Sequence, residues 1–247
     1  MAKKGEKTRI DRLLAARGFC PSRQKAKAVI MAGQVEVDGV KIDKPGTLIS
    51  SASSVKLMQK DLPYVSRGGI KLKEALDYFS VDVTGLTVMD IGASTGGFSD
   101  CLLKRGAAKI IAIDVGYGQL DWSLRCDPRV EVRERTNARY LKPDEFNEVI
   151  HGSVIDVSFI SLRLIVPAVM RLLRENSFII ALIKPQFEVG RDQVGKGGVV
   201  RSSMLHQEVI ESLEQFFKDI GLTPSGVIPS PILGPKGNKE FLTHLRL

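Results

Sequence analysis

The feature that most constrains the fold is an alternation, beyond Pro63, of short apolar runs with longer amphipathic segments. Several apolar runs have strand length and are continuous, as in residues 178–183. Such strands are buried on both faces, which favours a parallel sheet covered by helices on each side. The candidate strands are Thr87–Asp90, Lys109–Asp114, Val130–Arg133, Ser153–Asp156, Ile179–Ile183, Gly226–Pro229 and Phe241–Leu245, and the candidate helices are Ile70–Phe79, Gly97–Arg105, Leu162–Arg174 and Ser203–Ile220.

The excess positive charge of the chain is concentrated at one end. Residues 1–63 contain 13 Lys and Arg against 6 Asp and Glu, whereas the remaining 184 residues contain 23 against 22. Scattered basic residues are usually a solvated surface, but residues 1–63 carry a net charge of +7 out of the formal +8, which favours a module that binds a polyanion. We expect residues 1–60 to form a small domain, 61–66 a linker and 67–247 the main domain.

The first 60 residues have an internal order of their own. A short helix is predicted to end at Gly18, and a second, opened by Pro21-Ser22-Arg23, is predicted to end at Gly33. The next segment alternates like a strand around Asp38-Gly39, which favours a hairpin turn. The apolar helix faces are Ile10, Leu13 and Leu14 in the first helix and Ala26, Val29 and Ile30 in the second.

The pattern R-I-D-x-L-L…G…S-R…A…I…G-x-V-x-V-D-G, over about residues 8–60, resembles the S4 RNA-binding domain of ribosomal protein S4, pseudouridine synthases and tyrosyl-tRNA synthetases. The resemblance implies that the two helices bind structured RNA. Helices present cations to phosphates in a rigid way. The residues predicted to contact RNA are Arg9, Arg12, Arg23, Lys25 and Lys27.

A glycine-rich turn follows the first predicted strand of the main domain, in Asp90-Ile-Gly-Ala-Ser-Thr-Gly-Gly-Phe. Gly92 allows a sharp turn, and Gly96 and Gly97 allow the backbone to approach a ligand and begin a helix. The spacing differs from the G-x-G-x-x-G dinucleotide fingerprint. The next strand ends at Asp114, which can accept hydrogen bonds from ribose hydroxyls. The alternative is a plain turn followed by a surface acid.

D-x-G-x-x-x-G-G-F is similar to the first motif of the class I (Rossmann-like) S-adenosylmethionine-dependent methyltransferases, and in particular to the FtsJ-like ribose 2′-O-methyltransferases. The resemblance implies S-adenosylmethionine as the cofactor. Asp114 would bind its ribose, and Asn137 would approach the adenine or cap a short helix. The residues assigned to the methionine part and the glycine turn are Asp90, Gly92, Ser94, Gly96 and Gly97.

Four charged residues border the apolar runs of the main domain. Asp156 closes one predicted strand, and Lys184 closes another after five apolar residues. A lysine there is costly to bury unless its charge is paired or its proton is lost. Lys71 begins a predicted helix and Glu240 opens the last strand. Taken singly, these two have ordinary interpretations, as a solvated helix residue and a strand-edge charge.

Taken together, the four residues match the K-D-K-E set of the FtsJ-like enzymes in chain order and in position relative to the strands. A ribose 2′-hydroxyl is a weak nucleophile that must lose its proton as it attacks a methyl group, and only a neutral lysine can accept that proton. The resemblance makes Lys184 the candidate base, with Lys71 favouring the neutral amine or orienting the ribose. Asp156 and Glu240 would position the lysines and balance charge.

The combination of an S4-like module with these motifs resembles the TlyA (haemolysin A) family throughout. Its members are described as rRNA 2′-O-methyltransferases acting on cytidine, with a historical haemolysin label. The resemblance therefore implies ribosomal RNA or ribosomal subunits as the partner. The further motifs that carry it are Tyr64-Val-Ser-Arg-Gly-Gly-Ile-Lys-Leu, Ile155-Asp-Val-Ser-Phe-Ile-Ser-Leu and Ile183-Lys-Pro-Gln-Phe-Glu.

Several other classes of protein are disfavoured. Three cysteines without C-x-x-C spacing argue against a disulfide framework, and three distant histidines argue against a histidine-based metal site. No apolar run approaches the roughly 20 residues that cross a bilayer, and no signal segment follows the charged first residues. We expect a cytoplasmic protein with no metal, no membrane association and no obligate protein partner.

Two alternatives to an active methyltransferase stay open. One is a membrane-acting lysin, as the historical label suggests, although the predicted helices are too polar and too short for stable insertion. The other is an RNA-binding protein whose methyltransferase domain has lost activity. The four charged positions are all filled, which disfavours the second alternative.

Overall fold

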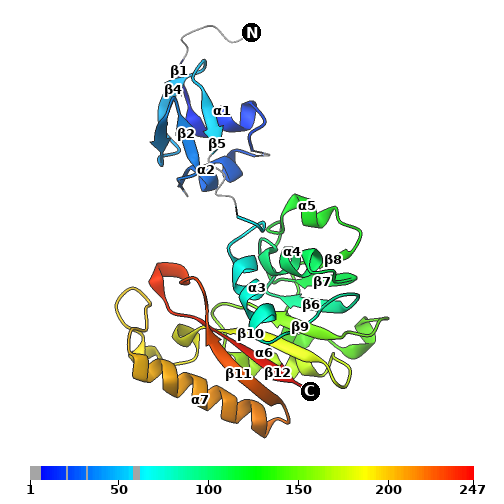
Figure 1. Ribbon diagram of the computed structural model, residues 1–247. Helices are drawn as coiled ribbons and strands as arrows, with labels where there is room; N and C mark the ends of the chain where they lie inside the picture. The colour runs from blue at the N-terminus through cyan, green and yellow to red at the C-terminus, as the bar shows by residue number, and fades with distance from the viewer. Residues whose placement is uncertain (1–6, 21, 32, 58–61) are drawn as a thin grey trace. The chain divides into compact units, whose positions relative to one another are not determined.

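The computed structural model describes residues 7–20, 22–31, 33–57 and 62–247 (Figure 1). The chain divides into two compact units, Met1–Leu62 (unit 1) and Pro63–Leu247 (unit 2). Each unit has hydrophobic core clusters of its own. The division falls within the predicted linker 61–66, whose residue Asp61 lies outside the described part of the chain.

Unit 1 contains the two predicted helices and the predicted hairpin. Helix α1 spans Ile10–Ala16 and helix α2 spans Arg23–Met31, and their apolar faces meet in one buried cluster. Asp38 and Gly39 both have positive φ, at 49° and 83°, as a two-residue hairpin turn requires. Pro21, predicted to open α2, lies outside the described residues. The strands are β1 Lys7–Arg9 paired with β4 Leu48–Ser50, and β2 Val35–Val37 between β3 Val40–Ile42 and β5 Val55–Leu57.

Unit 2 is built on the predicted sheet, and the α/β fold class is confirmed. All seven predicted strands are present, with ends shifted by up to three residues, in the order β11-β12-β10-β9-β6-β7-β8. The five strands from β10 to β8 are parallel. The strands are β6 Thr87–Ile91, β7 Lys109–Ile113, β8 Val130–Arg133, β9 Gly152–Ile155, β10 Phe178–Ile183, β11 Thr223–Pro229 and β12 Phe241–Arg246.

The sheet departs from the predicted parallel arrangement at β12, which runs antiparallel to both of its neighbours. Parallel neighbours need a long crossover, whereas the segment between β11 and β12 holds only the short helix η5, Pro235–Gly237. The chain therefore reverses. In the resulting register Ile183 faces Phe241, so the start of β12 lies at the edge where β10 ends.

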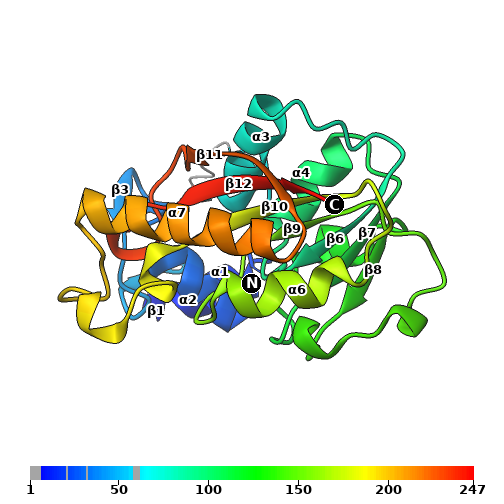
Figure 2. The same cartoon turned by 90° about the horizontal axis from the view of Figure 1, so that it is seen from below.

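Helices cover both faces of the sheet (Figure 2). On one face, α3 (Gly68–Tyr78) and α4 (Gly97–Lys104) pack in one core cluster; on the other, α6 (Leu162–Met170) and α7 (Ser203–Asp219) pack in a second. The short α5 (Trp122–Arg125) precedes β8. Helix α6 was expected to reach Arg174 but ends at Met170, because the chain tightens into turns and the Arg174 amide bonds to the carbonyl of Ile150.

Over the described residues, no helix is long and apolar enough to cross a membrane. The same residues contain no cluster of three or more His, Cys, Asp or Glu side chains suited to a metal ion. The three cysteines are free thiols, with Cys20 and Cys101 buried and Cys126 exposed.

Candidate active site

The four charged residues singled out in the sequence line one cavity of about 300 Å³ in unit 2. We call Lys71, Asp156, Lys184 and Glu240 the tetrad and this space the tetrad cavity. Asp156 follows β9 and Lys184 follows β10, at the carboxyl ends of parallel strands. Glu240 reaches the same edge because β12 is antiparallel, and Lys71 comes from the first turns of α3. The tertiary structure thus joins residues up to 169 positions apart.

Two carboxylates hold the two lysines of the tetrad. The Nζ atom of Lys184 lies 2.6 Å from Oδ1 of Asp156 and donates to Oγ of Ser158 at 2.9 Å. The Nζ atom of Lys71 donates to Oε2 of Glu240 at 2.5 Å. Lys71 and Lys184 are each 8% exposed as residues, so each charge is largely removed from water and needs its partner.

Ser158 was missed by the sequence analysis. It lies two residues beyond Asp156 in a segment that the resemblance already covered, and a hydroxyl just after a strand end was the available signal. Its hydroxyl accepts a hydrogen bond from Lys184 and so fixes the direction of that amine. The structure therefore adds Ser158 to the polar side chains that line the tetrad cavity and contact the tetrad.

Glu240 is the most enclosed member of the tetrad. It is 2% exposed, and its Oε1 atom has no hydrogen-bond partner among the described residues. A Cβ atom at Gly234 would lie 2.0 Å from that oxygen, so only glycine permits this approach. Glu240 is therefore held by Lys71 on one oxygen and by close packing on the other.

The glycine-rich turn lies against the tetrad. Gly92 has φ +82°, and a Cβ atom there would meet the carbonyl oxygen of Asp156 at 2.5 Å. Gly96, at φ +91°, precedes α4, and a Cβ at Gly97 would lie 2.1 Å from Oγ of Ser66. These glycines allow the close approach that the sequence predicted, although the atoms approached belong to the protein itself.

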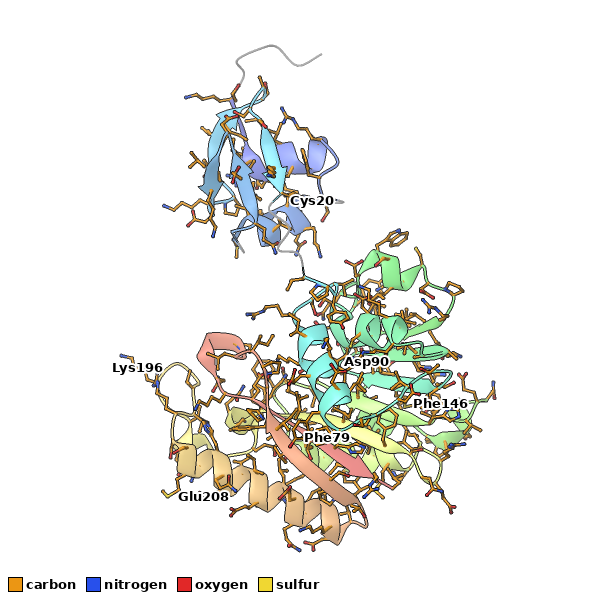
Figure 3. All side chains as sticks on the ribbon, viewed as in Figure 1. Cys20, Phe79, Asp90, Phe146, Lys196 and Glu208 are labelled. Carbon is orange, nitrogen blue, oxygen red and sulfur yellow. The ribbon has the colours of Figure 1, made fainter. Side chains whose placement is uncertain are left out.

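Asp90, at the end of β6, is wholly buried in unit 2 (Figure 3). Its Oδ2 atom accepts hydrogen bonds from the amide of Ser99 at 2.9 Å and from its hydroxyl at 2.6 Å. Its Oδ1 atom has no partner among the described residues. Burial raises the pKa of Asp90 to about 7, and the negative charges of Asp156 and Asp114 add to the effect.

A second cavity of about 470 Å³ adjoins the first, and we call it the adjoining cavity. The two share lining residues, among them Gly92, Ser94 and Asp156. Asp114 lines the adjoining cavity, and its carboxylate accepts hydrogen bonds from the amides of Ser94 and Gly116, at 2.8 and 2.7 Å. Asn137 also lines it, and its side chain caps the short helix η1, Ala138–Tyr140, by accepting from the Arg139 amide.

The tetrad cavity and the adjoining cavity fit the two ends of S-adenosylmethionine. Asp90 lines the tetrad cavity, and its Oδ1 atom has no partner among the described residues. That oxygen can accept a hydrogen bond from an ammonium group. The adjoining cavity is lined mainly by apolar side chains, with Asp114 and Asn137 among its polar groups, as a nucleoside site is. In the described structure, both oxygens of Asp114 are already engaged by backbone amides.

The five cations predicted to bind RNA fall into two groups in unit 1. Arg9 and Arg23 both pair with Asp11, whose side chain is fully buried. Arg12, Lys25 and Lys27 are exposed, and within the described part of the chain none of them forms an ion pair. The sequence analysis named the cations but missed Asp11, which appeared only as a letter of the S4-like pattern.

A mostly parallel sheet with a glycine-rich turn after β6, and a cavity lined by paired lysines and carboxylates, defines a methyltransferase of the Rossmann-like class. The family model "FtsJ-like methyltransferase" matches residues 64–247, and the model "S4 domain" matches residues 8–54. The chain belongs to the FtsJ-like methyltransferase family and carries an S4 domain at its amino-terminal end. The predicted family is thereby confirmed.

Two relatives match this chain across both of its domains. "Putative rRNA methyltransferase YqxC" of Bacillus subtilis is 48% identical over 97% of this chain and 86% of its own length. The "16S/23S rRNA (cytidine-2'-O)-methyltransferase TlyA" of Mycobacterium tuberculosis is 44% identical over 97% and 90%.

Solved structures agree. A "Putative hemolysin from Streptococcus thermophilus" matches with 46% identity and a TM-score of 0.77, covering 97% of this chain and 88% of that chain. A Burkholderia thailandensis methyltransferase with bound S-adenosylhomocysteine matches with 15% identity and a TM-score of 0.50, over 73% of this chain and 76% of that one. At that identity the likeness concerns the fold alone, which is that of S-adenosylmethionine-dependent methyltransferases.

Proposed function

We propose that this protein transfers a methyl group from S-adenosylmethionine to a ribose 2′-hydroxyl of ribosomal RNA, at a cytidine. The observation that carries the proposal is the assembly of the tetrad in one cavity beside the glycine-rich turn. The names of the relatives support the substrate, since one of them is a 16S/23S rRNA cytidine 2′-O-methyltransferase. An enzyme with this substrate would work in the cytoplasm.

In this proposal Lys184 is the base. When bound, S-adenosylmethionine supplies an electrophilic methyl group to the ribose oxygen. Lys184 must first give up its own proton to solvent. The neutral Nζ atom then accepts the hydroxyl proton as that oxygen attacks, and the Asp156 carboxylate, 2.6 Å away, stabilises the ammonium that forms again. Ser158 orients the same amine through its hydroxyl. Holding the reacting groups in line contributes much of the rate, because their orientation is fixed before the reaction.

Lys71 and Glu240 have a supporting role in the proposal. Their pair is buried beside that of Lys184 and Asp156 in the same cavity. The positive charge of Lys71 disfavours a second positive charge nearby. Its amine can also donate a hydrogen bond to a ribose oxygen. Glu240 keeps Lys71 from turning away, because a buried amine that lost its carboxylate would be left unpaired.

The cofactor sites are proposed on the same footing. Asp90, through its free Oδ1 atom, would accept from the ammonium group of the methionine part, with Gly92, Ser94 and Gly97 forming the wall. Gly96 does not line this cavity and would contribute only through the turn before α4 that its positive φ allows. Asp114 would bind the ribose once a hydroxyl replaces one of its backbone donors. Asn137 would approach the adenine from its position at the start of η1. The domain limits 1–60, 61–66 and 67–247 remain part of the proposal.

Mapping of 2′-O-methylated positions in ribosomal RNA, with and without this protein, tests the proposal directly. We expect one or a few cytidines to gain a methyl group with the wild-type chain and none with Lys184→Ala. The absence of any new methylated ribose would contradict the proposal. If RNA binding persisted without donor binding in calorimetry, the inactive RNA-binding alternative would take its place.

A further inference from the structure

Asp11 is a buried acid outside the proposed active site. It lies in the first turn of α1, and its side chain is fully buried. Three donors reach its carboxylate: Nε and Nη2 of Arg9, each at 3.1 Å, and Nε of Arg23 at 3.0 Å. The hydrogen bonds from Arg9, helped by the one from Arg23, lower the pKa of Asp11 to about 2 despite burial. The carboxylate is therefore ionised at neutral pH.

The two guanidinium groups keep donors to spare. Arg9 uses Nε and one N–H of Nη2, and Arg23 uses Nε alone. Within the described residues, Nη1 of Arg9 and both Nη atoms of Arg23 donate to no other group. Their side chains remain 40% and 44% exposed, whereas Asp11 has no exposed surface. The cluster is thus closed towards the core and open, with net charge +1, towards solvent.

We infer that Arg9, Asp11 and Arg23 form a preassembled site for phosphate groups of the RNA backbone, with Asp11 as its positioning residue. A guanidinium presents paired N–H donors that match two phosphate oxygens, and both guanidiniums here are held by their inner edges with the outer edges free. The inference rests on the proposed function, because it takes ribosomal RNA as the ligand of unit 1.

Preassembly distinguishes these arginines from the other predicted RNA contacts. Arg12, Lys25 and Lys27 are exposed and, among the described residues, form no ion pair. A long flexible side chain must lose rotamer freedom when it meets a phosphate, whereas Arg9 and Arg23 have already lost much of theirs on folding. We call Arg9, Asp11 and Arg23 the Asp11 cluster. We therefore expect this cluster to contribute more to the RNA affinity than its share of the positive charge would.

A purely electrostatic account makes the opposite prediction for one substitution. Asp11→Asn removes a negative charge from an RNA-binding domain, so charge alone would tighten binding. Loss of the positioning carboxylate would instead weaken it. The direction of the change therefore separates a positioning role from a simple contribution to net charge.

The test measures equilibrium binding of the full chain to purified bacterial ribosomal subunits at fixed salt. We expect Asp11→Asn to weaken binding at least fivefold. Arg9→Lys and Arg23→Lys should each weaken it about tenfold, because lysine keeps the charge but cannot donate to Asp11 with one edge and to a phosphate with the other. Arg17→Lys, at an exposed arginine of unit 1 that is not among the predicted RNA contacts, is the matched control and should change binding less than twofold. Thermal unfolding of each variant checks that unit 1 still folds.

Binding by Asp11→Asn that equals or exceeds that of the wild type would overturn the inference. Equal losses in Arg17→Lys and Arg23→Lys would also overturn it. If Asp11→Asn fails to fold, the lysine variants at the half-exposed arginines decide the question. Methylation of ribosomal RNA by the wild-type chain in the same preparation tests the proposed function separately, and a wild type that binds no subunit would overturn both.

Discussion

The Asp11 cluster and the tetrad use the same interaction for different ends. In unit 1 one buried carboxylate holds two guanidiniums that remain 40% and 44% exposed. In unit 2 two carboxylates hold two amines, and the lysine side chains are only about a tenth exposed. The first arrangement leaves positive charge facing solvent, and the second leaves a balanced set of charges facing a cavity.

The difference shows how the ratio of acids to bases, together with exposure, separates binding from chemistry. An exposed cation attracts phosphate through water and is weakened by salt. A buried and balanced pair has no such reach, but its proton can be shared with a substrate that enters the cavity. The following predictions test this contrast.

The largest effect is expected at Lys184. Lys184→Ala removes the proposed base and should lower the methylation rate by about a thousandfold or more, within the range of general-base catalysis. Affinity for ribosomal subunits should change little, because the side chain is 9% exposed. Lys73→Ala, which removes an exposed lysine paired with Asp77 on α3, is the control. Turnover near the wild-type rate would rule out Lys184 as the base.

Removal of unit 1 should produce the next largest effect. The segment 63–247 has its own core clusters and is nearly neutral, so it should keep donor binding but lose RNA affinity by about a hundredfold at low salt. The slope of log affinity against log salt should also flatten. Filter binding over a range of salt concentrations measures both quantities. An unchanged slope would place the RNA-binding surface in unit 2.

Donor binding should depend on pH through Asp90. Its pKa of about 7 means that the carboxyl is largely protonated at pH 6 and ionised at pH 8. A cationic donor favours the ionised form, so its affinity should rise by about tenfold between pH 6 and pH 8. Calorimetry of S-adenosylmethionine binding measures the change. Asp90→Asn should bind the donor more weakly and without this pH dependence, whereas a flat wild-type profile would contradict the proposed contact.

The smallest predicted effect is at Ser158. Ser158→Ala removes the hydroxyl that orients Lys184 and should lower the methylation rate about fivefold, the equivalent of one hydrogen bond of ~1 kcal/mol. The donor and RNA affinities should be unchanged. Ser123→Ala, at a serine on α5 outside both cavities, serves as the control. Equal rates in the two variants would mean that Asp156 alone fixes the amine.

Much of the fold was predictable because a continuous apolar run of strand length is stable as a strand buried on both faces of a sheet. The run ending at Ile183 is buried along its whole length, as its composition indicated. The direction of β12 was not predictable from its residues, because the apolar pattern of a strand is the same whether it runs parallel or antiparallel to its neighbours. Its reversal depends on the short segment after Pro229, and that reversal brings Glu240 to the tetrad.

The site was predictable to a similar degree. Lys184 and Asp156 stood out because a charge after an apolar run demands a partner, and each proves to be the other's partner. Asn137 left two roles open, and the structure shows the helix cap. Ser158 and Asp11 escaped notice because a single serine or aspartate carries no periodic signal. Only their distances to Lys184, Arg9 and Arg23 reveal them.

The amino-acid sequence alone determined the strands, the helices, the segregation of charge and the identity of the residues in the tetrad. These are local properties, set by apolar periodicity and residue type. The tertiary structure alone decided which carboxylate holds which cation, and whether that cation faces water or a cavity. Pairing depends on strand direction and burial across segments far apart in the chain, and these are properties of the packed molecule rather than of any one segment.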